Sequence, residues 1–298
     1  ALITSAPVVC PVHPRWRLVL SIFKLRIGVL IMLTALAGMA MVPGAQATPW
    51  QIVVLALGVL VASASAGAFN QYVEASSDRL MTRTQGRAFA SGALQARPRW
   101  LLLMLVMLAV AVVATGLATH WLAAVFVLLG ALTYALVYTV GLKRRTPWNI
   151  VIGGAAGSFA VLAGAAAVSP QIGPMAYLLA LVLLLWTPPH FWSLAIANAD
   201  QYAAAGVPML PVVVGVARAA RIVHYSTIAL VIATFLPLGF GAGGVYGLGA
   251  LVGGAIFLRK TSVLSRAPVR ANAMAAFFAS MMQLSLLILG VWLDAALR

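Results

Sequence analysis

The chain has 298 residues, of which 63% are hydrophobic and only 8% are charged, and its mean hydropathy is +1.06. This composition excludes a soluble globular domain and indicates a protein that crosses the bilayer several times. The single cysteine, Cys10, excludes an internal disulfide and a thiolate metal site. Any bound metal would therefore have oxygen or histidine ligands.

Nine apolar segments are long enough to cross a bilayer, which takes about 20 apolar residues. We therefore expect an all-α polytopic membrane protein, with residues 1–298 forming one transmembrane domain and residues 1–21 a short arm outside the membrane. The nine spans are expected at about 22–42, 50–72, 100–117, 120–141, 149–168, 174–197, 221–241, 243–259 and 272–293.

Eighteen of the nineteen Lys and Arg residues fall on one side of these spans, in the arm, at the entrance of the first span, or in alternate loops. By the positive-inside rule, the N-terminus and the basic loops are cytoplasmic and the C-terminus is outside. Membrane orientation thus explains the net charge of +15, and nucleic acid is not an expected partner. The expected location is the cell inner (cytoplasmic) membrane, with membrane lipids around the spans.

The most informative stretch is residues 70–87, NQYVEASSDRLMTRTQGR, at the cytoplasmic end of the second span. On a continuing helix, Asn70, Glu74 and Asp78 recur every four residues, so their side chains project from one face. Such hard oxygen ligands suit Mg²⁺, which takes few protein carboxylates and completes its shell with phosphate oxygens. The alternative is an ordinary helix end whose polar residues meet the lipid headgroups.

Basic side chains close to this cluster are expected to neutralise a diphosphate. They lie in the same loop and in the next cytoplasmic loop, which Tyr138 precedes: Arg79, Arg83, Arg87, Lys143 and Arg144. The alternative for the second group is a plain positive-inside anchor.

A second stretch, residues 186–213, reads WTPPHFWSLAIANADQYAAAGVPMLPVV. Pro188 and Pro189 are expected to break or kink the sixth span, and such breaks usually line a cavity. Asp200 would be a further metal ligand and Tyr202 a phosphate hydrogen-bond donor, or the segment is a kinked structural helix with an interfacial Asp. His190 could contact a metalloporphyrin or take a proton, or it could bond to a carbonyl that the break leaves free.

Four motifs in the chain resemble those of protohaem IX farnesyltransferases, a group within the UbiA-type membrane prenyltransferases. They are NQY..E...D..M.RT..R, LKRRTP.NIVIGG.AG, WTPPHFW.LA and Y..AGVPMLPVV. The resemblance implies a nine-helix bundle with two aspartate-containing motifs on cytoplasmic loops. It also implies farnesyl transfer from farnesyl diphosphate to a vinyl group of haem B, with Mg²⁺, giving haem O for terminal oxidase assembly. Haem A synthase or oxidase assembly proteins would be further partners.

Several positions depart from the pattern of that family. Ala75 stands where Arg is usual, and Ala88 where an Arg-Pro pair is usual. The Asp-Tyr pair of the second motif is Gln201-Tyr202 here, with Asp200 one residue earlier, a rotation of about 100° on a helix. The alternatives are therefore UbiA-type prenyl transfer to another acceptor, or a non-catalytic relative that binds haem or lipid.

Overall fold

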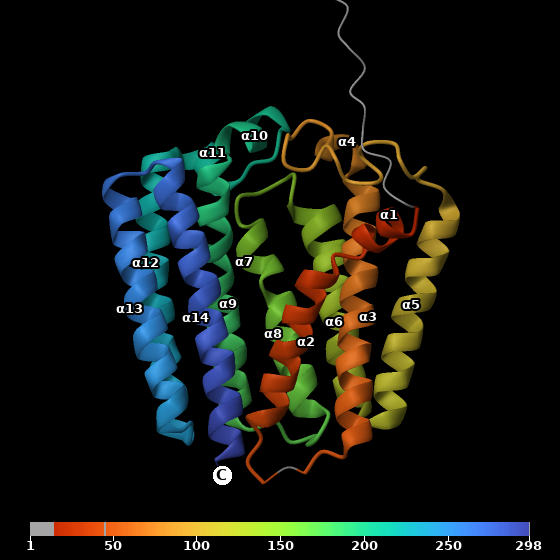
Figure 1. The fold of residues 1–298 in the computed structure, drawn as a ribbon, viewed down its shortest axis with the longest axis vertical. Helices are drawn as coiled ribbons and strands as arrows, with labels where there is room; N and C mark the ends of the chain where they lie inside the picture. Colours follow the sequence, from red (N-terminus) through yellow and green to blue (C-terminus); the bar gives the residue numbers. More distant parts are fainter. Residues whose placement is uncertain (1–14, 45, 298) are drawn as a thin grey trace, which may run out of the picture.

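The computed structural model describes residues 15–44 and 46–297, in which all regular elements are helical (Figure 1). Eight helices are long and apolar enough to cross a membrane, and there are nine crossings if α1 (Arg15–Ile22) and α2 (Leu25–Ala40), which meet at a 45° bend, together make one span. The expected all-α multi-pass architecture is confirmed for these residues. The other crossings are α3 (Pro49–Val73), α5 (Pro98–Ala118), α6 (Trp121–Leu132) with the π-helix η1 (Thr133–Leu142), α7 (Asn149–Gly153) with α8 (Ala155–Ala166), α9 (Pro174–Ala197), α12 (Val216–Phe235) with the 3₁₀ turn η2 (Leu236–Phe240), α13 (Gly244–Arg266) and α14 (Arg270–Ala296).

Glycines let α2 approach the middle of the bundle. A Cβ on Gly38 would overlap the carbonyl oxygen of Val161, and a Cβ on Gly164 would overlap that of Ala35. The backbones of α2 and α8 are therefore in contact, as small residues permit in membrane bundles.

Only the last part of the expected N-terminal arm lies within the described residues. Residues 1–14 of the expected 1–21 arm lie outside the described residues. From Arg15 the chain is helical as α1, and the position of this arm outside the membrane stays a prediction.

Of the break or kink expected at Pro188 and Pro189, the break is wrong. Helix α9 runs through both prolines and ends at Ala197, and the chain breaks at Asn198, where φ is −130° and ψ is 30°. Transmembrane helices tolerate proline because neighbouring side chains satisfy the freed backbone groups.

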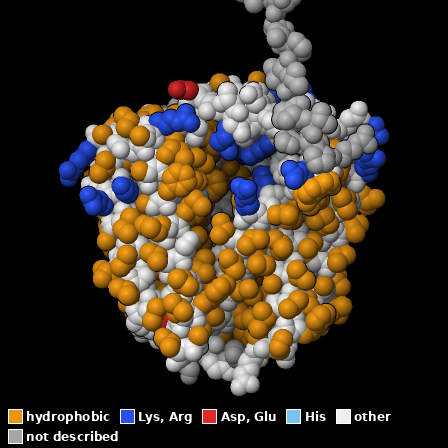
Figure 2. All heavy atoms as spheres, in the orientation of Figure 1, with side chains coloured by type: hydrophobic (Ala, Val, Ile, Leu, Met, Phe, Trp, Pro, Cys, Tyr) orange, Lys and Arg blue, Asp and Glu red, His pale blue; other side chains and the backbone are white. Residues whose placement is uncertain are grey.

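Basic side chains gather in a band at one end of the molecule, seen as the upper blue side chains in Figure 2. The same end carries the short helices α4 (Ala75–Asp78), α10 (Ala199–Ala204) and α11 (Leu210–Val214) (Figure 1). Both motif stretches therefore lie at the basic end. That this end faces the cytoplasm stays a prediction from the positive-inside rule.

We expect a reporter that is active only outside the cytoplasm to be active when fused after Leu297, because an odd number of crossings separates the two ends. The same reporter fused after Arg145, in a basic loop, should be silent. Activity of both fusions, or of the Arg145 fusion alone, would contradict this orientation.

Candidate active site

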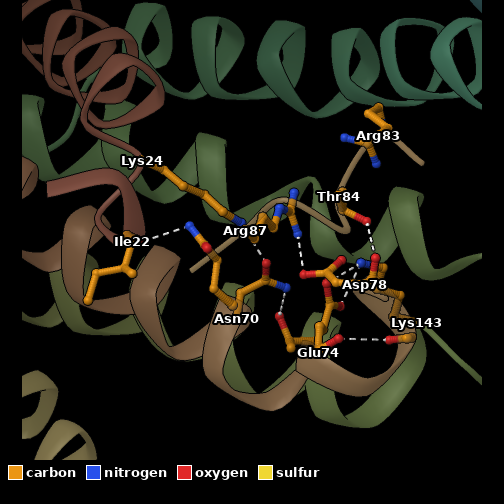
Figure 3. Close-up of polar contacts among 12 residues, drawn as sticks. Ile22, Lys24, Asn70, Glu74, Asp78, Arg83, Thr84, Arg87 and Lys143 are labelled. Carbon is orange, nitrogen blue, oxygen red and sulfur yellow. Dashed lines mark hydrogen bonds and ion pairs between the residues drawn. The ribbon is translucent and has the colours of Figure 1, made fainter. Parts of the chain in front are cut away.

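The first motif lies at the junction between α3 and α4. Helix α3 ends at Val73, and Glu74, with φ −88° and ψ 3°, starts the single turn of α4. The Glu74 amide donates to the Asn70 carbonyl at 3.0 Å, and the Asp78 amide donates to the Glu74 carbonyl at 2.8 Å. These two bonds preserve the four-residue spacing across the junction, so the three side chains lie together (Figure 3). Asn70, Glu74 and Asp78 are only 2%, 3% and 1% exposed.

Each of these three side chains is paired with a cation from a different part of the chain (Figure 3). Lys143, after η1, lies 2.5 and 2.6 Å from the two carboxylate oxygens of Glu74. Arg87, in the loop after α4, places Nη1 2.7 Å from Asp78 Oδ2.

Lys24, at the bend between α1 and α2, donates from Nζ to Asn70 Oδ1 at 2.5 Å. It also donates to the Tyr134 hydroxyl at 3.3 Å. The sequence predicted Arg87 and Lys143 beside the cluster but gave no role to Lys24. The only sign of such a role in the sequence was the position of Lys24 at the start of an apolar span.

The π-helix η1 orients the Asn70 amide. Asn70 Nδ2 donates to Thr139 Oγ1 at 3.1 Å, and this hydroxyl in turn donates to the Tyr134 carbonyl, five residues earlier, at 2.8 Å. Since a lysine can only donate, Oδ1 must be the atom that faces Lys24. The i→i+5 register of η1 also places the Tyr134 and Tyr138 rings in a stack with centroids 5.6 Å apart. Tyr138 lies under Lys143, as expected of a residue near that cluster, with Nζ 5.7 Å from its ring centroid.

The donor set fits a hard divalent cation. Among the described residues, no group of three His, Cys, Asp or Glu side chains could hold a metal, so the set is two carboxylates and the Asn70 amide oxygen. Asp78 Oδ1 is buried and has no hydrogen-bond partner. A buried carboxylate oxygen without a partner is costly, and a cation with several phosphate or water ligands would satisfy it.

The outer arginines have three different partners, and only Arg144 contacts a residue of α4. Arg144 donates to the Ser77 hydroxyl at 2.8 Å, and Arg83 reaches the Tyr202 hydroxyl at 3.4 Å. Arg79 instead donates from Nε to the Ala90 carbonyl at 2.8 Å, which braces its own loop. The expected phosphate contact of Arg79 therefore has no support in its placement.

The second motif meets the first through Gln201 and Tyr202. Gln201 Oε1 accepts from the backbone N–H of Arg83 at 3.2 Å, and Gln201 Nε2 donates to Asn198 Oδ1 at 3.4 Å. Asp200 is exposed on α10, and within the described ranges no hydrogen bond or ion pair involves its carboxylate. The expectation that Asp200 joins the acidic cluster is thus not supported, because α10 is helical and a shift of one residue turns the side chain by about 100°.

His190 also lies away from the cluster. Its Nδ1 is 2.7 Å from the Ser280 hydroxyl of α14, and its ring stacks between Trp186 and Phe277 at 4.1 and 4.5 Å between centroids. It is a packed interhelical residue, bonded to a hydroxyl rather than to a freed carbonyl.

An apolar cavity of about 130 Å³ lies against the cluster. Lys24 and Tyr134, which contact Asn70 or its cation, are among its few polar lining residues. On the face shown in Figure 2 the surface is hollowed below the basic band. The apolar lining comes from five helices and includes Ile31, Val59, Phe126, Ala160 and Phe191.

Residues 31–287 match the profile of the UbiA prenyltransferase family. The chain belongs to this family. A relative named protohaem IX farnesyltransferase 2, from Paramagnetospirillum magneticum, is 52% identical over 277 residues, which cover 93% of this chain and 96% of that protein. Protohaem IX farnesyltransferase 1 of the same organism is 45% identical over 94% of this chain and 98% of that protein.

Solved structures of remote UbiA proteins share the fold. A UbiA homologue from Archaeoglobus fulgidus, bound to DMAPP and Mg²⁺, has a TM-score of 0.71 at 16% identity, covering 94% of this chain and 99% of that one. A structure described as digeranylgeranylglyceryl phosphate synthase has a TM-score of 0.76 at 15% identity, covering 95% and 99%. The membrane bundle of this family member is therefore of the UbiA type.

We expect Asp78→Asn to lower magnesium-dependent binding of inorganic pyrophosphate by at least about a hundredfold, because it removes a buried charge that pairs with Arg87 and faces the cluster. Calorimetry on the detergent-solubilised chain would measure this. Asp294→Asn is the matched control, since Asp294 accepts from the backbone amides of Val245 and Tyr246 far from the cluster. If Asp78→Asn bound pyrophosphate as well as the parent, the cluster would be an ordinary polar helix end and not a metal site.

Proposed function

We propose that this family member transfers the farnesyl group of farnesyl diphosphate to a vinyl group of haem B and so forms haem O. The observation that carries the proposal is the juxtaposition of a buried, cation-lined carboxylate cluster with an apolar cavity. This arrangement suits a substrate with a diphosphate head and an isoprenoid tail. The names of the relatives at 52% and 45% identity support the farnesyl donor and the haem acceptor.

Asn70, Glu74 and Asp78 would hold magnesium through their oxygens, and the bound ion would offset part of the diphosphate charge. Arg87, Lys143 and Lys24 already converge on these oxygens, and Arg83 and Arg144 lie further out. Such a set of preorganised cations favours the charge that grows on the leaving group as the allylic C–O bond breaks. The described part of the second loop contributes Tyr202 and Gln201 rather than a carboxylate.

The remaining chemistry needs little from the protein. When the farnesyl C–O bond breaks, its electron pair leaves with the diphosphate, and the electron pair of the vinyl double bond forms the new C–C bond. Water then adds to the resulting cation and loses a proton, which leaves a hydroxyethylfarnesyl group. The apolar lining keeps bulk water away from the farnesyl cation until the acceptor has reacted, and no strong base is needed.

The setting follows from the same function. We place the protein in the cell inner membrane, with its basic end in the cytoplasm where a water-soluble diphosphate head would arrive. The product would pass to haem A synthase or to oxidase assembly proteins in the same membrane.

We expect the purified chain, given haem B, farnesyl diphosphate and magnesium, to produce haem O, detected by mass spectrometry of the extracted pigments. The reaction should stop when magnesium is chelated and resume when it is restored. Diphosphate binding without farnesylated haem would point to prenyl transfer to another acceptor. If the chain neither bound diphosphate nor farnesylated haem, it would be a non-catalytic relative that binds haem or lipid.

We expect Asp200→Ala to keep haem O formation within about twofold of the parent, because exposed side chains without partners contribute little. Gln201→Ala should lower it by about tenfold, since the Arg83 amide loses its acceptor and the two loops separate. Initial rates of haem O formation measure both. A large loss in Asp200→Ala would show that this carboxylate reaches the cluster after all.

A further inference from the structure

The oxygens of the cluster already have cations of the chain itself as partners, which is unusual for a metal site. Lys143 lies on both oxygens of Glu74, Arg87 on Oδ2 of Asp78, and Lys24 on Oδ1 of Asn70. Of the oxygens assigned to the metal, only Asp78 Oδ1 has no partner. A metal bound by these residues would therefore share all but one of its protein oxygens with the cations of the chain itself.

Lys24 is the cation held least firmly by charge. Within the described chain its hydrogen-bond partners are the neutral Asn70 amide and Tyr134 hydroxyl, whereas Lys143 and Arg87 have carboxylates. An ammonium with neutral partners gains little Coulomb energy from its position. It is the one cation of the three that an incoming anion could move without breaking an ion pair.

The backbone at Lys24 is held in an uncommon conformation. With φ 48° and ψ 42°, it is the one positive-φ residue other than glycine in the described chain. The buried Gln71 side chain fixes the bend by donating from Nε2 to the carbonyls of Ser21 at 3.0 Å and Ile22 at 3.1 Å. Strain that the surroundings over-determine is typical of functional positions. Here it aims the ammonium at the cluster from the rim of the cavity.

We propose that Lys24 makes the binding of magnesium and of the diphosphate mutually dependent, an inference that rests on the proposed function. Magnesium and the ammonium compete for Asn70 Oδ1, because two cations on one buried oxygen repel each other strongly. The displaced ammonium needs a new partner, since a buried charge without one is costly. An oxygen of the diphosphate is that partner, so magnesium enters together with the diphosphate and not before it.

Substitutions at Lys24 should therefore act in opposite directions on the two ligands. Without the ammonium, the metal meets less competition at Asn70, whereas the diphosphate loses a charge-assisted hydrogen bond. Lys24→Gly is the cleanest variant, because glycine adopts positive φ without strain and the bend should be preserved. Lys24→Met keeps the volume of the stem, and Arg26→Met is the matched control, an exposed charge lost two residues away.

The test uses the full chain in detergent, with Mn²⁺ as a paramagnetic stand-in for Mg²⁺ and inorganic pyrophosphate as the anion. Electron paramagnetic resonance measures free and bound Mn²⁺ with and without pyrophosphate. In the parent and in Arg26→Met, pyrophosphate should raise Mn²⁺ affinity by about a hundredfold or more. In Lys24→Gly and Lys24→Met, affinity for Mn²⁺ alone should rise about tenfold, and the effect of pyrophosphate should fall to about tenfold or less.

The outcomes separate this inference from the proposed function. If the parent binds Mn²⁺ equally well with and without pyrophosphate, the coupling is overturned while the metal site stands. If both Lys24 variants lose both ligands together, Lys24 is only structural and the proposal is overturned. If the parent binds no Mn²⁺ even with pyrophosphate, the proposed function fails along with it.

Discussion

The pairing of buried oxygens with partly buried cations at the end of α3 is the constraint on which the site depends. Glu74 and Asp78 are almost fully buried, and a buried charge is costly unless a partner of opposite charge lies beside it. The partners come from elements far apart in the chain: the α1–α2 bend, the loop after α4, and the end of η1. The charge requirement therefore draws the basic ends of several helices together and fixes their relative heights in the bundle.

Much of this could be predicted from the sequence because membrane physics acts locally. The bilayer thickness sets the length of the spans, and the orientation of the protein in the membrane sets the alternation of basic loops. The spacing of Asn70, Glu74 and Asp78 is kept across the α3–α4 junction because two backbone hydrogen bonds preserve it. What could not be predicted depends on contacts between distant segments. Lys24 reads as one more basic residue at a span entrance, and only the fold shows that it reaches Asn70.

The errors in the second stretch have a common cause. Pro188 and Pro189 predict a break only if their lost hydrogen bonds stay unsatisfied, and a helix packed among its neighbours does not meet that condition. The break falls instead at Asn198, and the residues after it form the short helix α10 rather than a loop. On this helix Asp200 points outward and Gln201 contacts Arg83. The same change removes His190 from the expected cavity wall, because an unbroken α9 directs it onto α14.

A neutral Gln201 at the mouth of the site decides how the two motif loops are joined. A carboxylate in this place would add a negative charge to the mouth of the site and so would favour another cation there. A neutral amide can instead accept from the Arg83 backbone and donate to Asn198 at once, which ties the loops together without a metal. The loop that carries Arg83 is then held before substrate arrives, so less of the binding energy is spent on ordering it. In this chain the second loop holds the loop that carries Arg83, and a bound metal would have to take its protein ligands from the first motif.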